Sequence, residues 1–279
     1  MPLFMHTTIE PVREFSYRGR DGWPLFAVAV GTGPLVVLLH GGGPDHRSLV
    51  PLARRLADRY TVALPDVRGY GRSSCPDPAR HTWRRYADDV AALLDHLGAK
   101  RAVVGGTGLG SSITLRTCLD HPDRVRAAVL VSVEEVEDDE AKAAETVFLD
   151  EFAARVRVEG LQAAWAPILP ALAPVIGALV AEAIPRCDPE SIAAAAAIGH
   201  DRLVRDVTEF AAITAPTLVI PGFDQRHPTA VAEAVAQVIP AGQLAGTGLS
   251  ADLHTADDLG AAFAPVIRAF LANPGQQGS

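Results

Sequence analysis

Two side chains near the end of the chain, Asp224 and His254, are of types that can hold and move a proton. Asp224 follows the apolar run "PTLVIPGF", and His254 precedes the apolar, helix-like run that closes the chain. Two glycine-rich stretches, "HGGGP" at 40–44 and "GGTGLG" at 105–110, each follow an apolar run. Glycine lets the backbone turn sharply and approach another group closely. These four segments are therefore the candidates for a reaction site.

The glycine-rich stretches do not form a nucleotide-binding motif. The stretch at 105–110 matches neither the dinucleotide fingerprint G-x-G-x-x-G nor the phosphate loop that ends in Gly-Lys-Ser/Thr, and no lysine follows it. The histidines, cysteines and acidic residues form no metal-ligand motif either. We therefore expect neither a nucleotide cofactor nor a metal.

Composition limits the classes of partner. The chain has 279 residues, of which 48% are hydrophobic, and this is enough to bury a large core. The formal net charge of -8 argues against a broad basic surface for nucleic acid. We expect a small-molecule substrate and no nucleic-acid partner, and the sequence predicts no particular oligomeric state.

The cysteines and the first residues of the sequence indicate in which cellular compartment the protein is expected. Cys75, Cys118 and Cys187 are few, odd in number and widely spaced, which argues against a disulfide framework and favours a reducing compartment. The stretch "MPLFMHTTIEPVREF" lacks the basic start and apolar run of a signal peptide. The expectation from these two features is a cytoplasmic protein.

One apolar stretch, residues 161–184, is about long enough to span a bilayer. Pro167, Pro170 and Pro174 would interrupt any helix there. We therefore expect two or three short apolar helices that cover a pocket, and no membrane association.

The order of apolar segments predicts the fold class. A hairpin around Asp21-Gly22 is followed by alternating strand-like and helix-like runs, which is typical of a mostly parallel sheet flanked by helices. The alternation stops near residue 135, gives way to an alanine-rich helical region, and resumes with "APTLVIPGFD". The prediction is an α/β core made of 1–134 and 211–279, with an inserted helical cap at 135–210.

Five elements in this order resemble the α/β-hydrolase fold superfamily, in the branch that carries a helical cap after the sixth core strand. They are "LLHGGGP", "PDVRGYGRSS", "GGTGLG", "PTLVIPGFDQRHP" and "ADLHTADDLGAAFAPVIRAFL". The resemblance covers nearly the whole chain and preserves both the order and the spacing of the elements.

The resemblance implies a role for five residues. The family places its nucleophile at the centre of a G-x-nucleophile-x-G elbow, and this position is Gly108 here. Asp224 stands at the position of the acid and His254 at that of the base. The amides of Gly42 and Leu109 match the two donors of the oxyanion hole. Because glycine adopts positive φ freely, the turn should form without the serine.

The same resemblance gives the expected lining of the substrate pocket. The loop after the first parallel strand, the elbow and the helical cap would supply the contacts. The expected contacts are Gly41, Gly43, His46, Thr107 and Trp165.

Other side chains near the elbow are alternative candidates for the nucleophile. Ser111 and Ser112 lie one turn into the following helix, where a hydroxyl would point along or away from the helix. Thr107 precedes the tip and should face another way, and Cys118 is expected to be a core residue.

Alternatives also exist for the acid and the base. Glu134 and Glu135 follow a core strand and could serve as an acid or contact a ligand. His227 is expected to be a solvated loop histidine, three residues after Asp224.

The function that these features favour is an α/β-hydrolase-fold enzyme for a small or medium apolar carbonyl compound, an ester, lactone or ketone. With Gly108 it would work without an acyl-serine, using His254 and Asp224 as a general base. Hydrolysis, carbon–carbon cleavage, cyclisation and elimination all fit. Two alternatives stay open: a non-catalytic ligand-binding or regulatory homologue, and a serine esterase whose nucleophile was replaced by glycine through an inactivating substitution.

Overall fold

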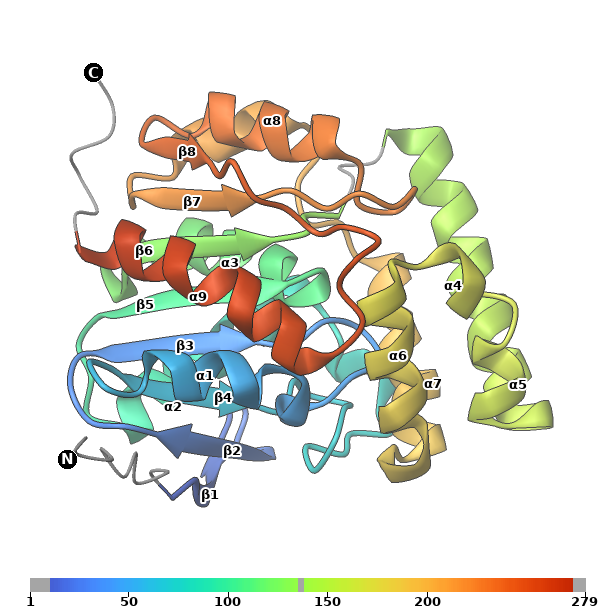
Figure 1. Ribbon diagram of the computed structural model, residues 1–279. Coiled ribbons are helices and arrows are strands. Elements are labelled where there is room, and N and C mark those ends of the chain that lie inside the picture. Colours follow the sequence, from blue (N-terminus) through green and yellow to red (C-terminus); the bar gives the residue numbers. More distant parts are fainter. Residues whose placement is uncertain (1–10, 135–137, 273–279) are drawn as a thin grey trace, which may run out of the picture.

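The centre of the molecule is one mostly parallel sheet (Figure 1). The computed structural model describes residues 11–134 and 138–272. Within them the sheet has eight strands in the order β1-β2-β4-β3-β5-β6-β7-β8, with β1 and β2 antiparallel to their neighbours. The strands are β1 (Arg13–Arg18), β2 (Pro24–Val30), β3 (Leu35–Leu39), β4 (Thr61–Pro65), β5 (Ala102–Thr107), β6 (Val125–Val131), β7 (Thr217–Ile220) and β8 (Gly242–Leu244).

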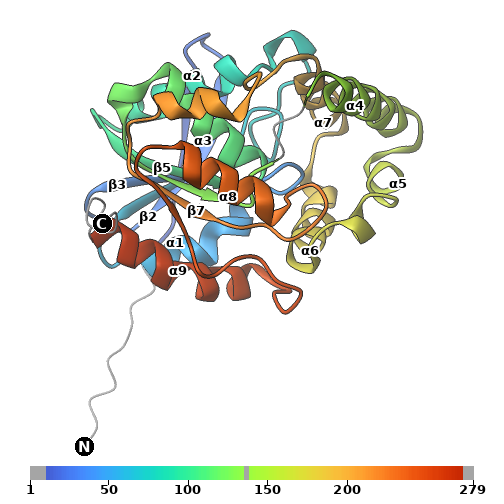
Figure 2. The ribbon, with the colours of Figure 1, turned by 90° about the horizontal axis from the view of Figure 1, so that it is seen from above.

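Helices cover both faces of the sheet (Figure 2). On one face, α1 (Val50–Leu56) and α9 (Ala256–Ala272) pack in a core cluster that includes Val36 and Leu38 of β3. On the other face lie α2 (Trp83–His96), α3 (Leu109–Asp120) and α8 (Thr229–Val238), in a cluster that includes Leu39. Successive residues of β3 therefore contribute to opposite faces, as the two-residue period of a strand requires. The predicted fold class is confirmed.

In its described residues, the chain between β6 and β7 forms helices joined by turns and irregular segments, with no strand. It contains α4 (Asp139–Glu159), α5 (Leu161–Trp165), α6 (Pro174–Ala183) and α7 (Pro189–Ala195), together with short 3₁₀ turns such as η4 (Leu169–Ala171). We call residues 138–212 the helical insertion. Its helices α4, α5, α6 and α7 lie beyond the carboxyl ends of the parallel strands (Figure 1). Substrates of open α/β sheets bind at this edge.

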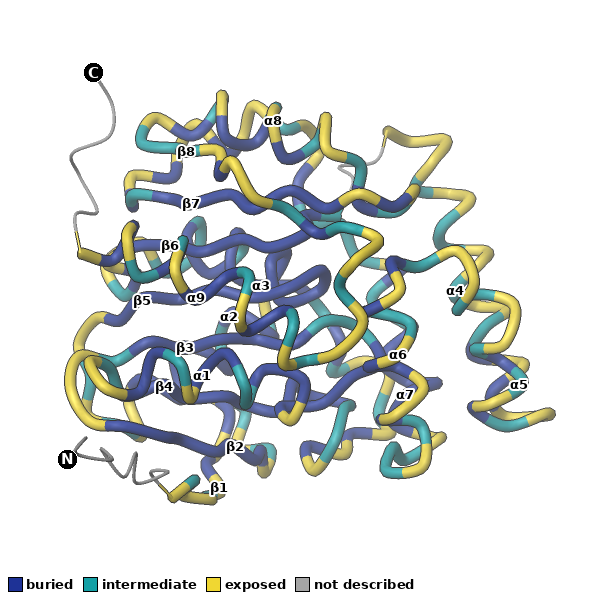
Figure 3. The backbone as a smooth tube through the Cα atoms, viewed as in Figure 1, coloured by how far each residue is buried: buried dark blue, intermediate teal, exposed yellow. Residues whose placement is uncertain are grey.

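The apolar stretch at 161–184 breaks where its prolines stand. It forms α5, η4 and α6, with Pro174 as the first residue of α6. Among the described residues, no helix combines the length and the apolar character needed to cross a membrane. Figure 3 shows the central strands buried while α4 and α5 keep much of their surface exposed. The insertion therefore covers one edge of the core.

Candidate active site

A sharp turn joins β5 to α3, and Gly108 stands at its tip. Its φ is +50°, a conformation that favours glycine. The flanking glycines are fixed by packing, since a Cβ on Gly106 would stand 2.4 Å from the carbonyl carbon of Gly110. The Gly108 N–H donates to the Val131 carbonyl at 3.0 Å, which ties the tip to the end of β6. The turn thus has the backbone expected of the predicted elbow, with glycine at its tip.

The histidine beside this tip is His227. A Cβ built on Gly108 would lie 3.4 Å from His227 Nε2. The other ring nitrogen, Nδ1, lies 2.7 Å from Asp224 Oδ1. His227 is buried, with 6% of its surface exposed, so the expectation of a solvated loop histidine was wrong. The Asp224–His227 pair therefore presents Nε2 to the space that a side chain at 108 would occupy.

A local turn after β7 builds this pair. Asp224 Oδ1 accepts hydrogen bonds from the backbone N–H groups of Arg226 at 3.1 Å and of His227 at 3.0 Å. This turn brings the His227 ring back onto the same carboxylate. The second oxygen, Oδ2, accepts a hydrogen bond from the Ala173 N–H at 3.2 Å. The acid is thereby connected to the helical insertion.

The surroundings of Asp224 favour its charged form. Burial alone would raise the pKa of this carboxyl, but the hydrogen bond and charge of His227 and the backbone donors outweigh burial and lower the pKa. An ionised Asp224 accepts a hydrogen bond from Nδ1–H, which leaves Nε2 of the neutral ring as the acceptor. This assigns the tautomer that a general base needs.

The predicted pairing of Asp224 with His254 does not occur. His254 is exposed, and its N–H donates to Asp258 Oδ2 at 3.1 Å. Thr255 and Asp258 exchange backbone and side-chain hydrogen bonds in a capping box that starts α9. His254 belongs to this helix start and does not line the pocket at Gly108. The sequence signal for the actual pair is the Asp-x-x-His turn that directly follows β7.

The two segments predicted to supply oxyanion donors lie next to each other. A Cβ on Gly42 would stand 4.0 Å from Leu109 Cβ and 3.9 Å from the Tyr70 hydroxyl. Leu109 is the first residue of α3, and the first N–H groups of a helix have no acceptor within it. Burial, with the charge of Glu134, raises the pKa of Tyr70, so this phenol stays protonated and can donate.

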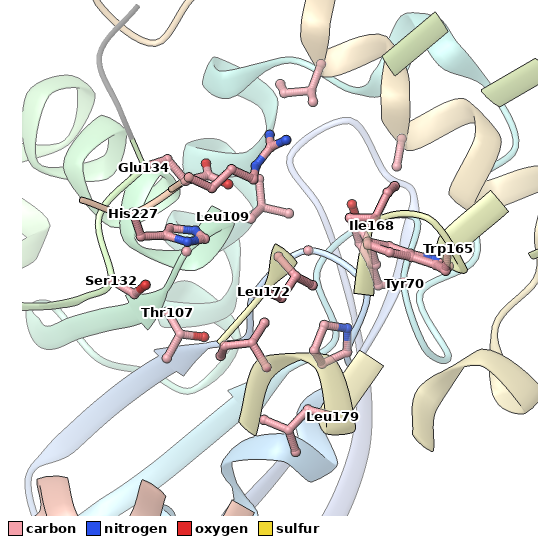
Figure 4. Close-up of a pocket in the computed structure, with 18 of the residues that line it drawn as sticks. Tyr70, Thr107, Leu109, Ser132, Glu134, Trp165, Ile168, Leu172, Leu179 and His227 are labelled. Atoms are coloured by element: carbon pink, nitrogen blue, oxygen red, sulfur yellow. The ribbon is translucent and has the colours of Figure 1, made fainter. Parts of the chain in front are cut away.

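A largely apolar pocket opens over Gly108 (Figure 4). Figure 4 draws Thr107, Ser132 and His227 at one end, and Tyr70, Trp165 and Ile168 at the other. Its apolar lining comes mainly from the helical insertion: Phe148, Leu149, Phe152, Trp165, Ile168, Leu172, Ile176, Leu179, Ile192 and Ile198.

The predicted substrate contacts divide into two groups. Gly41, Thr107 and Trp165 line the pocket, whereas Gly43 and His46 do not. A Cβ on Gly43 would stand 2.9 Å from Val180 Cγ2, so this residue packs against the insertion. His46 is buried, and both its backbone N–H and its Nδ1 lie 2.8 Å from Asp66 Oδ1, so its ring is bound to the protein and not offered to a substrate.

Three of the four other candidate nucleophiles are hydrogen-bonded within the protein or buried in the core. The Ser111 hydroxyl lies 2.8 Å from both the Gly106 and the Val131 carbonyl oxygens, and Ser112 donates to Glu134 Oε2 at 3.1 Å. Cys118 is buried, and burial raises the pKa of its thiol to about 12.

The acidic alternatives sit differently. Glu134 lines the pocket, and Glu135 lies outside the described residues.

Comparisons with known proteins agree with the fold. Residues 34–169 match the family model described as alpha/beta hydrolase fold. A thermophilic esterase from Thermogutta terrifontis superposes with a TM-score of 0.79 at 26% identity, over 94% of this chain and 99% of the esterase.

Curated relatives match over shorter stretches. A fluoroacetate dehalogenase from Burkholderia sp. is 36% identical over 110 residues, which is 38% of this chain and 36% of that protein. A 2-(acetamidomethylene)succinate hydrolase from Mesorhizobium japonicum is 35% identical over 101 residues, 36% of each. The matches thus span little more than a third of the length of either relative. The family-model match ends before Asp224 and His227.

The lowered pKa of Asp224 predicts a pH dependence of stability. The stabilisation by the ionised carboxylate is fully present above the pKa of an unfolded aspartate, near pH 4, and is lost as pH falls through the lower folded pKa. Asp224→Asn should therefore reduce the free energy of unfolding by about 1–3 kcal/mol at neutral pH. The difference in the free energy of unfolding between the wild type and Asp224→Asn, here called the gap, should shrink below about pH 4.

Urea unfolding at a series of pH values measures the gap. Asp252→Asn, at an exposed position, is the control and should show little effect at any pH. A gap for Asp224→Asn that stays constant to the lowest pH would contradict the assigned ionisation.

Proposed function

Because the chain belongs to the α/β-hydrolase fold superfamily, we propose that it is an enzyme that hydrolyses a small or medium apolar ester or lactone without an acyl-enzyme. One observation carries the proposal: His227 Nε2 faces the position of the family nucleophile, which is Gly108. The base and its acid are present while the hydroxyl is absent. Water can then take the place of the serine oxygen.

The substrate would bind with its carbonyl over the elbow. The carbonyl oxygen lies toward the amides of Gly42 and Leu109, which stabilise the negative charge that develops on it. The apolar side chains of the helical insertion bury the rest of the molecule. This placement puts the carbonyl carbon above Gly108 and within reach of a water beside His227.

The reaction then needs two proton transfers. His227 Nε2 takes a proton from the water as the water oxygen bonds to the carbonyl carbon, and Asp224 stabilises the imidazolium. When the tetrahedral intermediate collapses, the bond to the leaving alkoxide breaks and His227 returns the proton to it. The products are a carboxylic acid and an alcohol, and no bond to the protein forms.

A panel of activated aryl esters and lactones tests the proposal. We expect at least one compound to be turned over, with a rate that increases with the apolar area that the pocket can bury. Compounds that raise the melting temperature but are never turned over would contradict the proposal and favour a ligand-binding protein.

A buried donor predicts one feature of the substrate. Trp83 lines the pocket, and its indole N–H is buried without an acceptor in the described part of the chain. Leaving such a donor unpaired is costly, so we expect the substrate to carry an acceptor that reaches it. Trp83→Phe should then lower kcat/KM about tenfold for a substrate that carries this acceptor.

For an analogue that lacks the acceptor, the same variant should leave kcat/KM unchanged within about twofold. Competition between the two compounds, measured with the wild type and with the variant, gives the ratio of their kcat/KM values directly. An equal loss for both compounds would assign Trp83 to packing alone.

A further inference from the structure

A strained serine, Ser132, lies on the wall of the pocket beside the elbow. It directly follows β6, and its N–H donates to the Ile220 carbonyl of the neighbouring strand at 2.9 Å. The preceding carbonyl, that of Val131, accepts the Gly108 N–H. Ser132 is thus held between the carboxyl ends of β5 and β7, next to the nucleophile position.

The backbone of Ser132 is unusual. Its φ is +57°, and no other non-glycine residue in the described ranges has a positive φ. Serine gains nothing by itself from this conformation, which glycine, asparagine and aspartate tolerate better. Such strain persists where the surrounding structure imposes it, and it clusters at functional sites.

The hydroxyl of Ser132 is buried and unused by the protein. The residue is 1% exposed, and Oγ has no hydrogen-bond partner in the described part of the chain. Ser132 nevertheless lines the pocket over Gly108. A buried hydroxyl is normally paired, so an unpaired one that faces a pocket indicates a partner that arrives with the ligand or the solvent.

Ser132 and His227 are neighbours because Gly222 has no side chain. A Cβ on Gly222 would lie 2.8 Å from Ser132 Oγ and 2.5 Å from His227 Cβ. Figure 4 draws the Ser132 hydroxyl beside the His227 ring and above Thr107. Ser132 Oγ and the His227 side chain therefore border the same end of the pocket over Gly108 (Figure 4).

We propose that Ser132 is a catalytic residue that holds the attacking water together with His227. This inference rests on the proposed function and adds the second anchor of the nucleophile. The water gives one proton to Nε2 and donates a hydrogen bond with the other to Ser132 Oγ. Its lone pairs then point away from both anchors and toward the carbonyl carbon. Ser132 itself forms no covalent bond, and its proton stays on Oγ.

Two variants separate the hydroxyl from the strain. Ser132→Ala removes the hydroxyl and keeps the positive φ, whereas Ser132→Gly removes both. We expect each variant to lower kcat at least tenfold with KM unchanged within twofold, while only Ser132→Gly raises the melting temperature. Thr217→Val is the control, because it removes a buried hydroxyl at the amino end of β7 that bonds to the Ala215 carbonyl. It should alter stability and leave kcat unchanged.

Competition between water and methanol as nucleophiles gives a product ratio that would not change if Ser132 had only a structural role. Methanol has one hydroxyl proton, which goes to His227, so its attack does not need Ser132. Ser132→Ala should therefore lower hydrolysis more than methanolysis and shift the products toward the methyl ester at least fivefold. Equal losses of both products would overturn the assignment, and so would an adduct on Ser132.

His227→Ala separates the two proposals. If this variant keeps full activity, the proposed function fails; if it is inactive while both Ser132 variants match the wild type, only the role of Ser132 fails. A high-resolution crystal structure needs no substrate. We expect an ordered water within hydrogen-bond distance of Ser132 Oγ and His227 Nε2. A Ser132 hydroxyl bonded to the protein, or a dry space above Gly108, would overturn the inference.

Discussion

Replacing His227 by alanine is expected to lower kcat by about 10²–10⁴-fold, which is the usual contribution of a general base. The reason is geometric, since Nε2 lies 3.4 Å from the position of a Cβ on Gly108 and Nδ1 is bonded to Asp224. Steady-state kinetics on the best ester of the panel measures the effect. KM should change little, because the ring acts on the water and not on the bound substrate.

His254→Ala is the matched control for this prediction. The His254 side chain is exposed at the start of α9 and away from the pocket, so its removal should leave kcat within about twofold. Both variants should keep a cooperative melting transition. If His254→Ala is the inactive variant and His227→Ala is active, the base has been assigned to the wrong histidine.

Gly108→Ser is expected to convert the site to acyl-enzyme chemistry. The nearest atoms to a Cβ at 108 are His227 Nε2 at 3.4 Å and Gly41 Cα at 4.0 Å, so a serine side chain has room beside the base. An activated ester should then give a burst of alcohol, and the protein mass should increase by one acyl group. The serine must adopt the positive φ of this turn, at a cost of about 1–3 kcal/mol in stability.

Gly108→Ala distinguishes the hydroxyl from the strain. It carries the same backbone cost and a methyl group in the same place, so it should melt at a similar temperature to Gly108→Ser and form no adduct. A folded Gly108→Ser protein that shows neither burst nor adduct would contradict the inferred positions of His227 and the oxyanion amides.

The elbow was predictable from the sequence because its chemistry is local. The glycines at 106, 108 and 110 are each required by a close contact or a positive φ, and their spacing reports this directly. The alternation of strands and helices is likewise encoded in the period of the apolar residues. The prolines of the 161–184 stretch marked where its helices end. The prediction of fold class followed from these signals.

The histidine that we propose as the base was not predictable in the same way. Both histidines stand in loops after late strands, and only the hydrogen-bonded turn at Asp224 decides which one reaches the elbow. The Asp-x-x-His pattern of that turn is visible in the sequence. Whether the turn reaches the elbow depends on the strand order, in which β6 lies between β5 and β7. The positive φ of Ser132 has no counterpart in the sequence, because it is imposed by the strands on either side.

The most direct measurement for the central claim is the intact mass of the wild-type protein during turnover. The reaction with the fastest ester is quenched in acid at times shorter than one turnover and during steady state. The account predicts an unmodified protein mass at every time while acid and alcohol accumulate. A protein that gains the mass of one acyl group and loses it as substrate is exhausted would contradict it.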